Sequence, residues 1–256
     1  MRLDVLSEAE LKGFLNPFSS LKFVKKSLHE LPFSQGLTVR GAHFGGIDPF
    51  CRALVNVDGK IDKNNFSKII FTELIDQRDK KVKDFIPTQS GFEYHDYPIY
   101  SMAFPWDSHT YNTFKENYLE MVVENRREHI ADSNILSTDF IYSDEYVSSH
   151  LDQFNMLLDS IKIDGYDPYH YKEYPKVLIL KDDNHWKWMM SGQGNHRAFL
   201  LSMLGYENLS CEIIKVVNRS DVDKWSNVIN GVYQKDHALK IFDLIFTGTR
   251  VCKGIV

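Results

Sequence analysis

A glycine-rich turn followed by a His-Arg pair is the stretch of this chain best suited to chemistry. Its residues are Ser191, Gly192, Gln193, Gly194, Asn195, His196 and Arg197. Small residues ahead of a helix start let backbone N–H groups point at an anion, and the helix dipole adds partial positive charge there. The imidazole and the guanidinium supply further donors. The pattern predicts a phosphate-binding turn. The simpler alternative is a tight connection between a strand and a helix, with an arginine on the surface.

The elements around this turn are short and well marked. Residues 176–180 form an apolar run of strand length, residues 181–184 are typical of a turn, and residues 185–189 alternate as a second strand. A largely apolar helix follows the turn, and Gly205 stands where a left-handed C-terminal cap is expected. The order strand, turn, strand, glycine-rich turn and helix would hold the His-Arg pair at a helix N-terminus.

Further elements are predicted on both sides of this core. Apolar residues recur at helical spacing over 110–132 and over 143–165, a strand is expected over 209–214, and two closing helices lie between 225 and 245. Residues 1–35 favour short helical pieces that end near Pro32. Strand-like runs follow at 37–40, 52–57 and 68–71. These elements predict an α/β (α+β) fold with a small mixed sheet and flanking helices mostly on one side.

Two other segments hold residues that chemistry uses. The loop 41–50 contains His43 and three glycines, and it is either a ligand-binding loop or only a tight connection. In the segment Phe104–Asp107, buried aromatic residues are favoured over a cleft lining. Three widely spaced cysteines without a CxxC motif indicate reduced, buried thiols.

Composition excludes several classes of protein. The chain has 256 residues, 43% of them hydrophobic and 25% charged, which is enough for one large domain or two modest ones. A net charge of −5 argues against a broad electrostatic contact with nucleic acid. No run approaches the roughly 20 apolar residues of a membrane span. We expect a cytoplasmic protein without a membrane span.

The order of elements from about residue 140 to 216 resembles that of the ParB/sulfiredoxin superfamily. The resemblance is carried by Ser160-Ile161 and Gly165 at a helix end, the strand after Pro175, the Gly194-Asn195-His196-Arg197 turn, Leu204-Gly205 and the strand from Leu209. Sulfiredoxins place a catalytic cysteine where this chain has Asn195, so thiol chemistry is not expected. DNA-partitioning members carry an Arg-Arg pair and a basic helix-turn-helix, which this chain lacks. The superfamily's small-molecule kinases are the closest in type.

The resemblance implies nucleotide binding at the turn. Ser191, Gly192, Gly194, Asn195, His196 and Arg197 would surround the phosphates of ATP or another nucleoside triphosphate. Residues 136–256 would form the nucleotide-binding domain with its closing helices, and residues 1–135 an N-terminal α+β region that selects the substrate or is accessory. Mg²⁺ would arrive with the nucleotide, because no dense cluster of metal ligands is present.

The expected function is phosphoryl transfer from a nucleotide to a small polar metabolite such as a sugar or an amino acid. Glu145, Asp144 and His196 are the candidate catalytic residues, with Glu173 as a rival carboxylate; Glu145 stands where the kinases keep an acidic residue before the helix. Its alternative role is to complement the helix dipole.

The charge-dense end of the helix over 110–132 offers a place for the substrate. Arg126 and Arg127 would face substrate anions, or else form a solvated face. The alternative function is a nucleotide-binding regulatory or DNA-associated module without turnover. A third alternative is a structural protein whose turn stays empty.

Overall fold

The computed structural model describes residues 28–38, 41, 43–44, 81–84, 94, 96, 103–107, 144–168 and 174–248. The strands there are β1 (His29–Pro32), β2 (Gly36–Leu37), β3 (Lys176–Asp182), β4 (His185–Met190) and β5 (Asn208–Asn218). The α-helices there are α5 (Asp144–Asp164), α6 (Asn195–Met203), α7 (Ser226–Ile229) and α8 (Lys235–Phe246). The 3-10 helices there are η1 (Phe33–Gln35), η2 (Val82–Asp84) and η5 (Arg219–Lys224). The fold belongs to the α+β class.

The described strands form one mixed sheet. Its order is β1-β5-β3-β4-β2, with antiparallel pairs β1·β5 and β3·β4 and parallel pairs β5·β3 and β4·β2. The hairpin β3–β4 turns through Asp183 and Asn184, and Asp183 has a φ of 46°. Aspartate tolerates that left-handed conformation better than most residues. The hairpin over 176–189 is confirmed, and each strand continues slightly beyond its predicted end.

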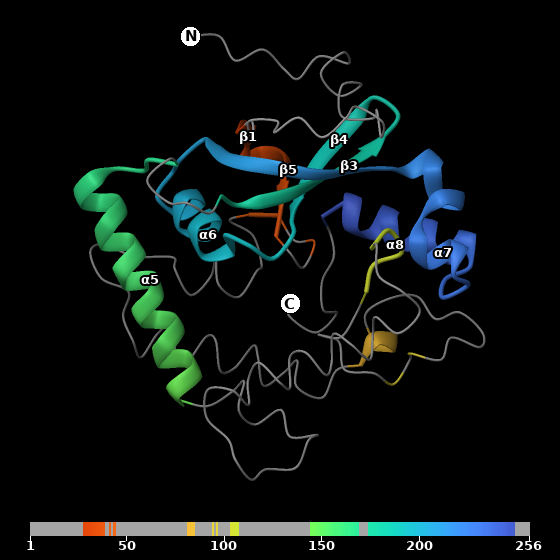
Figure 1. Ribbon diagram of the computed structural model, residues 1–256, viewed down its shortest axis with the longest axis horizontal. Helices are drawn as coiled ribbons and strands as arrows, with labels where there is room; N and C mark the ends of the chain where they lie inside the picture. The colour runs from red at the N-terminus through yellow and green to blue at the C-terminus, as the bar shows by residue number, and fades with distance from the viewer. Residues whose placement is uncertain are drawn as a thin grey trace, which may run out of the picture.

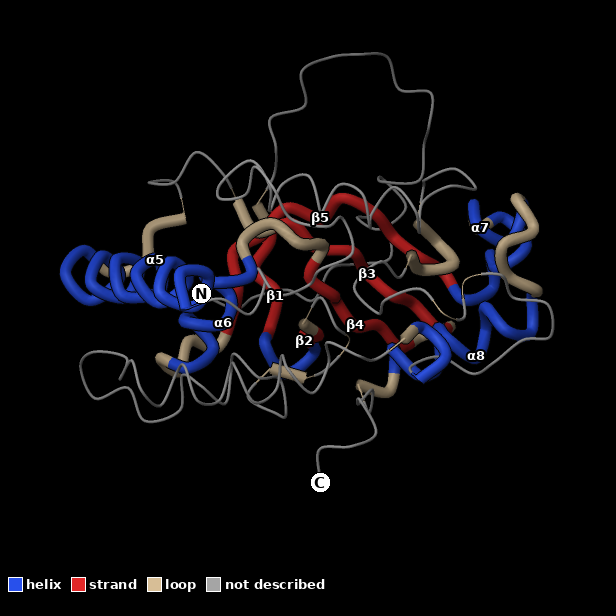
Figure 2. The backbone as a smooth tube through the Cα atoms, turned by 90° about the horizontal axis from the view of Figure 1, so that it is seen from below, coloured by secondary structure: helices blue, strands red, loops and turns tan. Residues whose placement is uncertain are grey.

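The two faces of the sheet bury separate apolar clusters. Alternation along β3 sends Val177 and Ile179 to the first cluster and Leu178 and Leu180 to the second. Helices α5 and α6 cover the first cluster, and α8 covers the second. Figures 1 and 2 show α5 and α6 near one end of the sheet and α7 and α8 near the other. The expectation that the helices lie mostly on one side is wrong, because a continuously apolar central strand buries both of its faces.

A bulge in β5 explains one exposed apolar residue. Val177 pairs with Ile213 and Leu178 pairs with Lys215, so Ile214 has no partner residue on β3. Ile214 is 47% exposed. A bulge inserts one residue and re-aims the side chains that follow it. After the bulge Lys215 donates a hydrogen bond to the carbonyl oxygen of Trp106, which ties β5 to the segment 103–107.

The second cluster is built largely from aromatic rings. Trp106 is fully buried, stacks on Phe104 at 5.1 Å, and meets Trp225 and Phe242 edge-on at 5.5 and 5.8 Å. The Tyr233 hydroxyl donates to the carbonyl oxygen of Ala103 at 2.7 Å. Burial raises the pKa of that hydroxyl well above its usual value. The prediction that the aromatic residues of 104–107 are core residues is confirmed for Trp106.

Strand β1 was not expected, because the sequence favours helical pieces up to Pro32. His29 to Pro32 instead pair with Cys211 to Asn208, and Leu31 is buried. A proline is tolerated here because β1 is an edge strand and Pro32 ends it. The carbonyl oxygen of Pro32 accepts a hydrogen bond from the Trp188 indole at 2.8 Å.

The sheet draws on both sides of the expected domain boundary at 135. β1 and β2 come from residues 29–37 and pair with β5 and β4. The boundary itself stays a prediction, since most of 1–135 lies outside the described residues. The strand-like runs 52–57 and 68–71 and the helix over 110–132 lie outside them as well.

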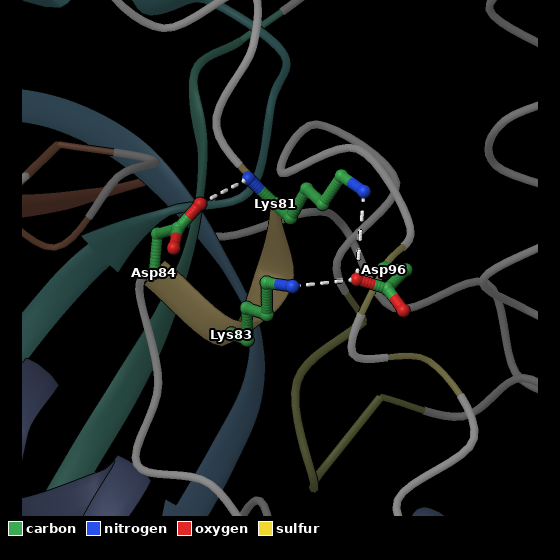
Figure 3. A network of polar contacts seen from close by, with 4 residues as sticks. All are labelled: Lys81, Lys83, Asp84 and Asp96. Carbon is green, nitrogen blue, oxygen red and sulfur yellow. Dashed lines mark hydrogen bonds and ion pairs between the residues drawn. The ribbon is translucent and has the colours of Figure 1, made fainter.

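A short ion-pair network joins η2 to Asp96 (Figure 3). Lys83 Nζ lies 2.8 Å and Lys81 Nζ 3.4 Å from Asp96 Oδ1, and the Lys81 backbone N–H donates to Asp84 Oδ2 at 2.8 Å. The hydrogen bond and charge of Lys83 lower the pKa of Asp96. All four residues are solvent-facing, so the network fixes a local turn and contributes little to global stability.

Within the described part of the chain, no helix combines the length and apolarity that crossing a bilayer requires.

Candidate functional site

The glycine-rich turn is held in place by hydrogen bonds to the start of β3. The Ser191 N–H and hydroxyl both donate to the carbonyl oxygen of Lys176, at 3.0 Å each, and the Lys176 N–H donates to the carbonyl oxygen of Gln193 at 3.2 Å. Ser191 therefore anchors the turn and is absent from the described pocket lining. Its expected place around the phosphates stays a prediction that this geometry does not favour.

Two glycines shape the turn. Gly192 and Gly194 have φ values of 104° and 84°, a region that side chains rarely adopt. Gly192 has open space around it, whereas a Cβ added at Gly194 would lie 2.6 Å from the Cα of Pro175. Gly194 is thus required both by its dihedral angles and by the close approach of the chain before β3.

Helix α6 begins directly after this turn. Gly194 is its N-terminal cap and has no side chain to accept from the first N–H groups. The first intrahelical bond joins the Ala198 N–H to the carbonyl oxygen of Gly194 at 3.0 Å. The N–H groups of residues 195–197 precede that bond, so helix geometry gives them no acceptor within the helix. This is the arrangement that favours an anion.

The other end of α6 is closed by its own backbone. The Tyr206 N–H donates to the carbonyl oxygen of Leu201 and the Gly205 N–H to that of Ser202, at 3.0 and 3.2 Å. With φ of 82° at Gly205, these two bonds form a Schellman motif. The predicted C-terminal cap at Gly205 is confirmed. The buried residues of α6, Ala198 to Leu201, pack into the first cluster and hold the helix against the sheet.

A pocket of about 340 Å³ lies between the N-terminus of α6 and helix α5. Its lining residues among those described are Gln153, Leu157, Gly192, Gly194, Asn195, His196 and Arg197. The structure thus brings together five of the six residues expected to bind nucleotide. It adds Gln153 and Leu157, which sequence reasoning missed. They stand one helical turn apart on α5, and a glutamine beside an apolar stripe is the only signal that could have found them.

The side chains of His196 and Arg197 each contact an aromatic residue of the protein. The His196 ring packs against Phe154 with centroids 4.4 Å apart. Arg197 lies close to the Tyr166 hydroxyl. Burial raises the pKa of Tyr166 to about 12, and Arg197 opposes that rise through its charge and a hydrogen bond. Tyr166 also donates to the carbonyl oxygen of Ser210 at 3.4 Å. The guanidinium thus has a fixed neighbour beside the pocket.

Asn195 contributes a buried polar atom at the same place. Its Oδ1 is enclosed and has no hydrogen-bond partner within the described part of the structure. Buried polar atoms in folded proteins nearly always have a partner, so Asn195 Oδ1 is an acceptor that a ligand, a water or a residue outside those described would satisfy.

The predicted catalytic carboxylates lie at the far end of α5. Asp144 and Glu145 open this helix, and Glu145 precedes Gln153 by eight residues. At 1.5 Å per residue that separation is about 12 Å along the helix axis. Figure 1 shows the first turn of α5 at the end remote from α6. The helix predicted over 143–165 is confirmed, but the side chains of Asp144 and Glu145 lie outside what the structure describes.

The remaining predicted residues are not placed. Arg126, Arg127 and Glu173 lie outside the described residues. No carboxylate belongs to the described lining of the pocket. The described residues also contain no group of three or more His, Cys, Asp or Glu side chains able to hold a metal.

Comparison with known proteins gives no relative, since no family model, no curated protein and no solved structure matches the chain.

Proposed function

We propose that the pocket at the N-terminus of α6 binds the phosphates of a nucleotide, and that the chain uses it as a nucleotide-dependent phosphotransferase. The observation that carries this proposal is that Asn195, His196 and Arg197, the first residues of α6, line one pocket of about 340 Å³. The acceptor would be a small polar metabolite such as a sugar or an amino acid.

The residues present suit a polyphosphate. The backbone N–H groups of 195–197 would donate to non-bridging oxygens, and the Arg197 guanidinium would offset their charge. Gln153 on α5 supplies an amide on the opposite wall. ATP would supply the transferable phosphoryl group, and Mg²⁺ would offset charge on its phosphates. Asp144 or Glu145 remains the proposed group that orients the acceptor.

A nucleotide-binding module without turnover is the second candidate. It is favoured by one observation: none of the described pocket residues carries a carboxylate that could activate an acceptor. In this case nucleotide binding would regulate association with a partner or DNA. The two functions share the binding step and differ only in product formation.

Binding is tested first by titration calorimetry of the full chain with ATP and Mg²⁺. Arg197→Ala should weaken ATP binding by about tenfold or more, because a charged hydrogen bond contributes roughly 1.5–3 kcal/mol. Arg219→Ala is the matched control, since Arg219 pairs with Asp243 at 2.7 Å between η5 and α8. Equal ATP binding by the wild type and Arg197→Ala, or none by the wild type, would refute the site.

Turnover is tested second. Incubation with ATP, Mg²⁺ and a metabolite pool should release ADP and form a phosphorylated product, and Arg197→Ala should abolish both. Binding without ADP release would select the regulatory candidate. The variants Glu145→Gln and Asp144→Asn test which of the two carboxylates orients the acceptor. The variant that removes this carboxylate should lose turnover but still bind ATP.

A further inference from the structure

A lysine and a histidine meet on the face of the sheet that α8 covers, opposite to α6. Lys187 lies on β4 between Trp188 and Trp186, and alternation places its side chain on the same face as Met189 of the second cluster. Its Nζ lies 3.2 Å from Nε2 of His43. The contact thus links β4 to His43, whose backbone forms an isolated antiparallel β-bridge with Leu37 of β2.

Lys187 lies beside an aromatic ring and is partly buried. Its Nζ lies 5.7 Å from the centre of the Phe246 ring at the end of α8. Lys187 is only partly exposed, and among the described residues it makes no ion pair with a carboxylate. Burial lowers the pKa of Lys187. A partly buried ammonium that has no carboxylate partner among the described residues gives up its proton more readily than a solvated one.

His43 also packs against the chain that follows α8. Gly248, just after α8, has a φ of 67°, and a Cβ added there would overlap the His43 ring. The backbone at Gly248 therefore packs directly against the His43 imidazole. With Lys187 as the hydrogen-bond donor, Nε2 of His43 is the acceptor and is placed to receive a proton.

We propose that Lys187 and His43 form a nucleophilic amine site that takes activated acyl compounds, and that Lys187 is a site of acylation in this protein. Its Nζ would attack the acyl carbon while the proton of the attacking amine passes to Nε2 of His43. The new bond is N–C, and the bond from the acyl carbon to the leaving group breaks with its electron pair. The product is a neutral amide. The site is independent of the α6 pocket.

The reaction can be measured on the full chain with the N-hydroxysuccinimide ester of acetate. Peptide mass spectrometry at low conversion gives the acetylation rate of each lysine. Lys176 and Lys181, on the neighbouring strand β3, are the internal references because both are partly exposed, as Lys187 is. Lys187 should react about tenfold faster or more, since a positioned general base contributes at least that much. A rate at or below that of both references overturns the proposal.

Variants of the histidine test the mechanism. In His43→Gln the amide oxygen still accepts a hydrogen bond but cannot take a proton, so the rate at Lys187 should fall about tenfold while both reference rates stay. His185→Gln, at the exposed start of β4, is the matched control. An unchanged Lys187 rate in a folded His43→Gln chain overturns the role of the imidazole. If that variant does not fold, Gly248→Ala, which displaces the ring without removing it, decides the same question by the same readout.

Discussion

Two separate effects, backbone strain and steric overlap, disfavour a side chain at Gly194. Their contributions to stability can be measured separately. Its φ of 84° strains any residue with a Cβ, and its neighbour Pro175 leaves no room for one. Gly205 has nearly the same φ, 82°, with nothing within 4 Å of an added Cβ. The pair therefore separates backbone strain from steric overlap.

Gly194→Ala should lower the free energy of unfolding by more than Gly205→Ala does. Strain alone costs about 1–2 kcal/mol, and overlap with a backbone atom adds about 1–3 kcal/mol. Urea denaturation of both variants measures the difference. Equal losses would mean that Pro175 moves aside freely, and that the turn is less rigid than its hydrogen bonds to Lys176 indicate.

Tyr166 offers a pH-dependent signature beside the pocket. Its pKa is raised to about 12, chiefly by burial, so its folded form keeps the proton longer than the unfolded form with an ordinary value near 10. The stabilisation from a neutral buried Tyr166 is complete below pH 10 and is lost as the pH rises toward 12.

The free energy of unfolding of the wild type should therefore fall relative to that of Tyr166→Phe as the pH rises from 10 to 12. Phenylalanine does not titrate, so taking the difference removes the contribution of the other tyrosines and the lysines. Urea denaturation at several pH values measures it. Parallel pH dependences for the two proteins would show that the Tyr166 hydroxyl is solvated in the folded state.

At the scale of elements, β2 is positioned by a glycine with ordinary dihedral angles. Gly36 has a φ of −88°, so an alanine there meets no backbone strain. A Cβ at Gly36 would overlap the Trp188 indole. This indole is fully buried and donates a hydrogen bond to the carbonyl oxygen of Pro32. The close approach of backbone to ring is what allows β2 to pair with β4.

Gly36→Ala should cost about 1–3 kcal/mol and disturb Trp188, because a filled core does not absorb an added methyl group. Denaturant unfolding measures the cost, and tryptophan fluorescence reports the environment of the indole. Trp188→Phe is a useful companion, since it leaves the Pro32 carbonyl oxygen without this donor. An unchanged stability for Gly36→Ala would indicate a loosely packed β2.

The central elements could be predicted because each carries local signals. β3, β4, α5, α6 and the Gly205 cap all follow from apolar periodicity and glycine placement. β1 could not, because its conformation is imposed by pairing with β5, 180 residues later. In the site, the turn was recognisable from sequence, whereas Gln153 and Tyr166 are brought to it only by packing between α5, β5 and α6. Glu145 could be chosen from its position in the chain, but its distance along α5 from the pocket could not.

At the scale of the whole molecule, the sheet couples the two apolar clusters. β3 contributes Val177 and Ile179 to one and Leu178 and Leu180 to the other. Phe154 on α5 and Phe242 on α8 are fully buried in opposite clusters. A loss of packing on either face therefore weakens the same strands.

Phe154→Ala and Phe242→Ala should each destabilise the described fold by about 3–5 kcal/mol. Each should shift far-UV circular dichroism and tryptophan fluorescence transitions together, because the shared sheet makes unfolding cooperative. Thermal or urea unfolding with both probes measures this. Two separate transitions in either variant would show that the α5–α6 side and the α8 side unfold independently.

The order of the strands has a consequence for synthesis on the ribosome. The two outer strands leave the ribosome first, and the three strands that they must join follow well over a hundred residues later. At bacterial or eukaryotic rates of elongation that interval is on the order of ten seconds. During it the early segments lack the described strands with which they pair, β5 and β4. Their brevity, four and two residues, leaves little exposed strand for nascent chains on neighbouring ribosomes to capture.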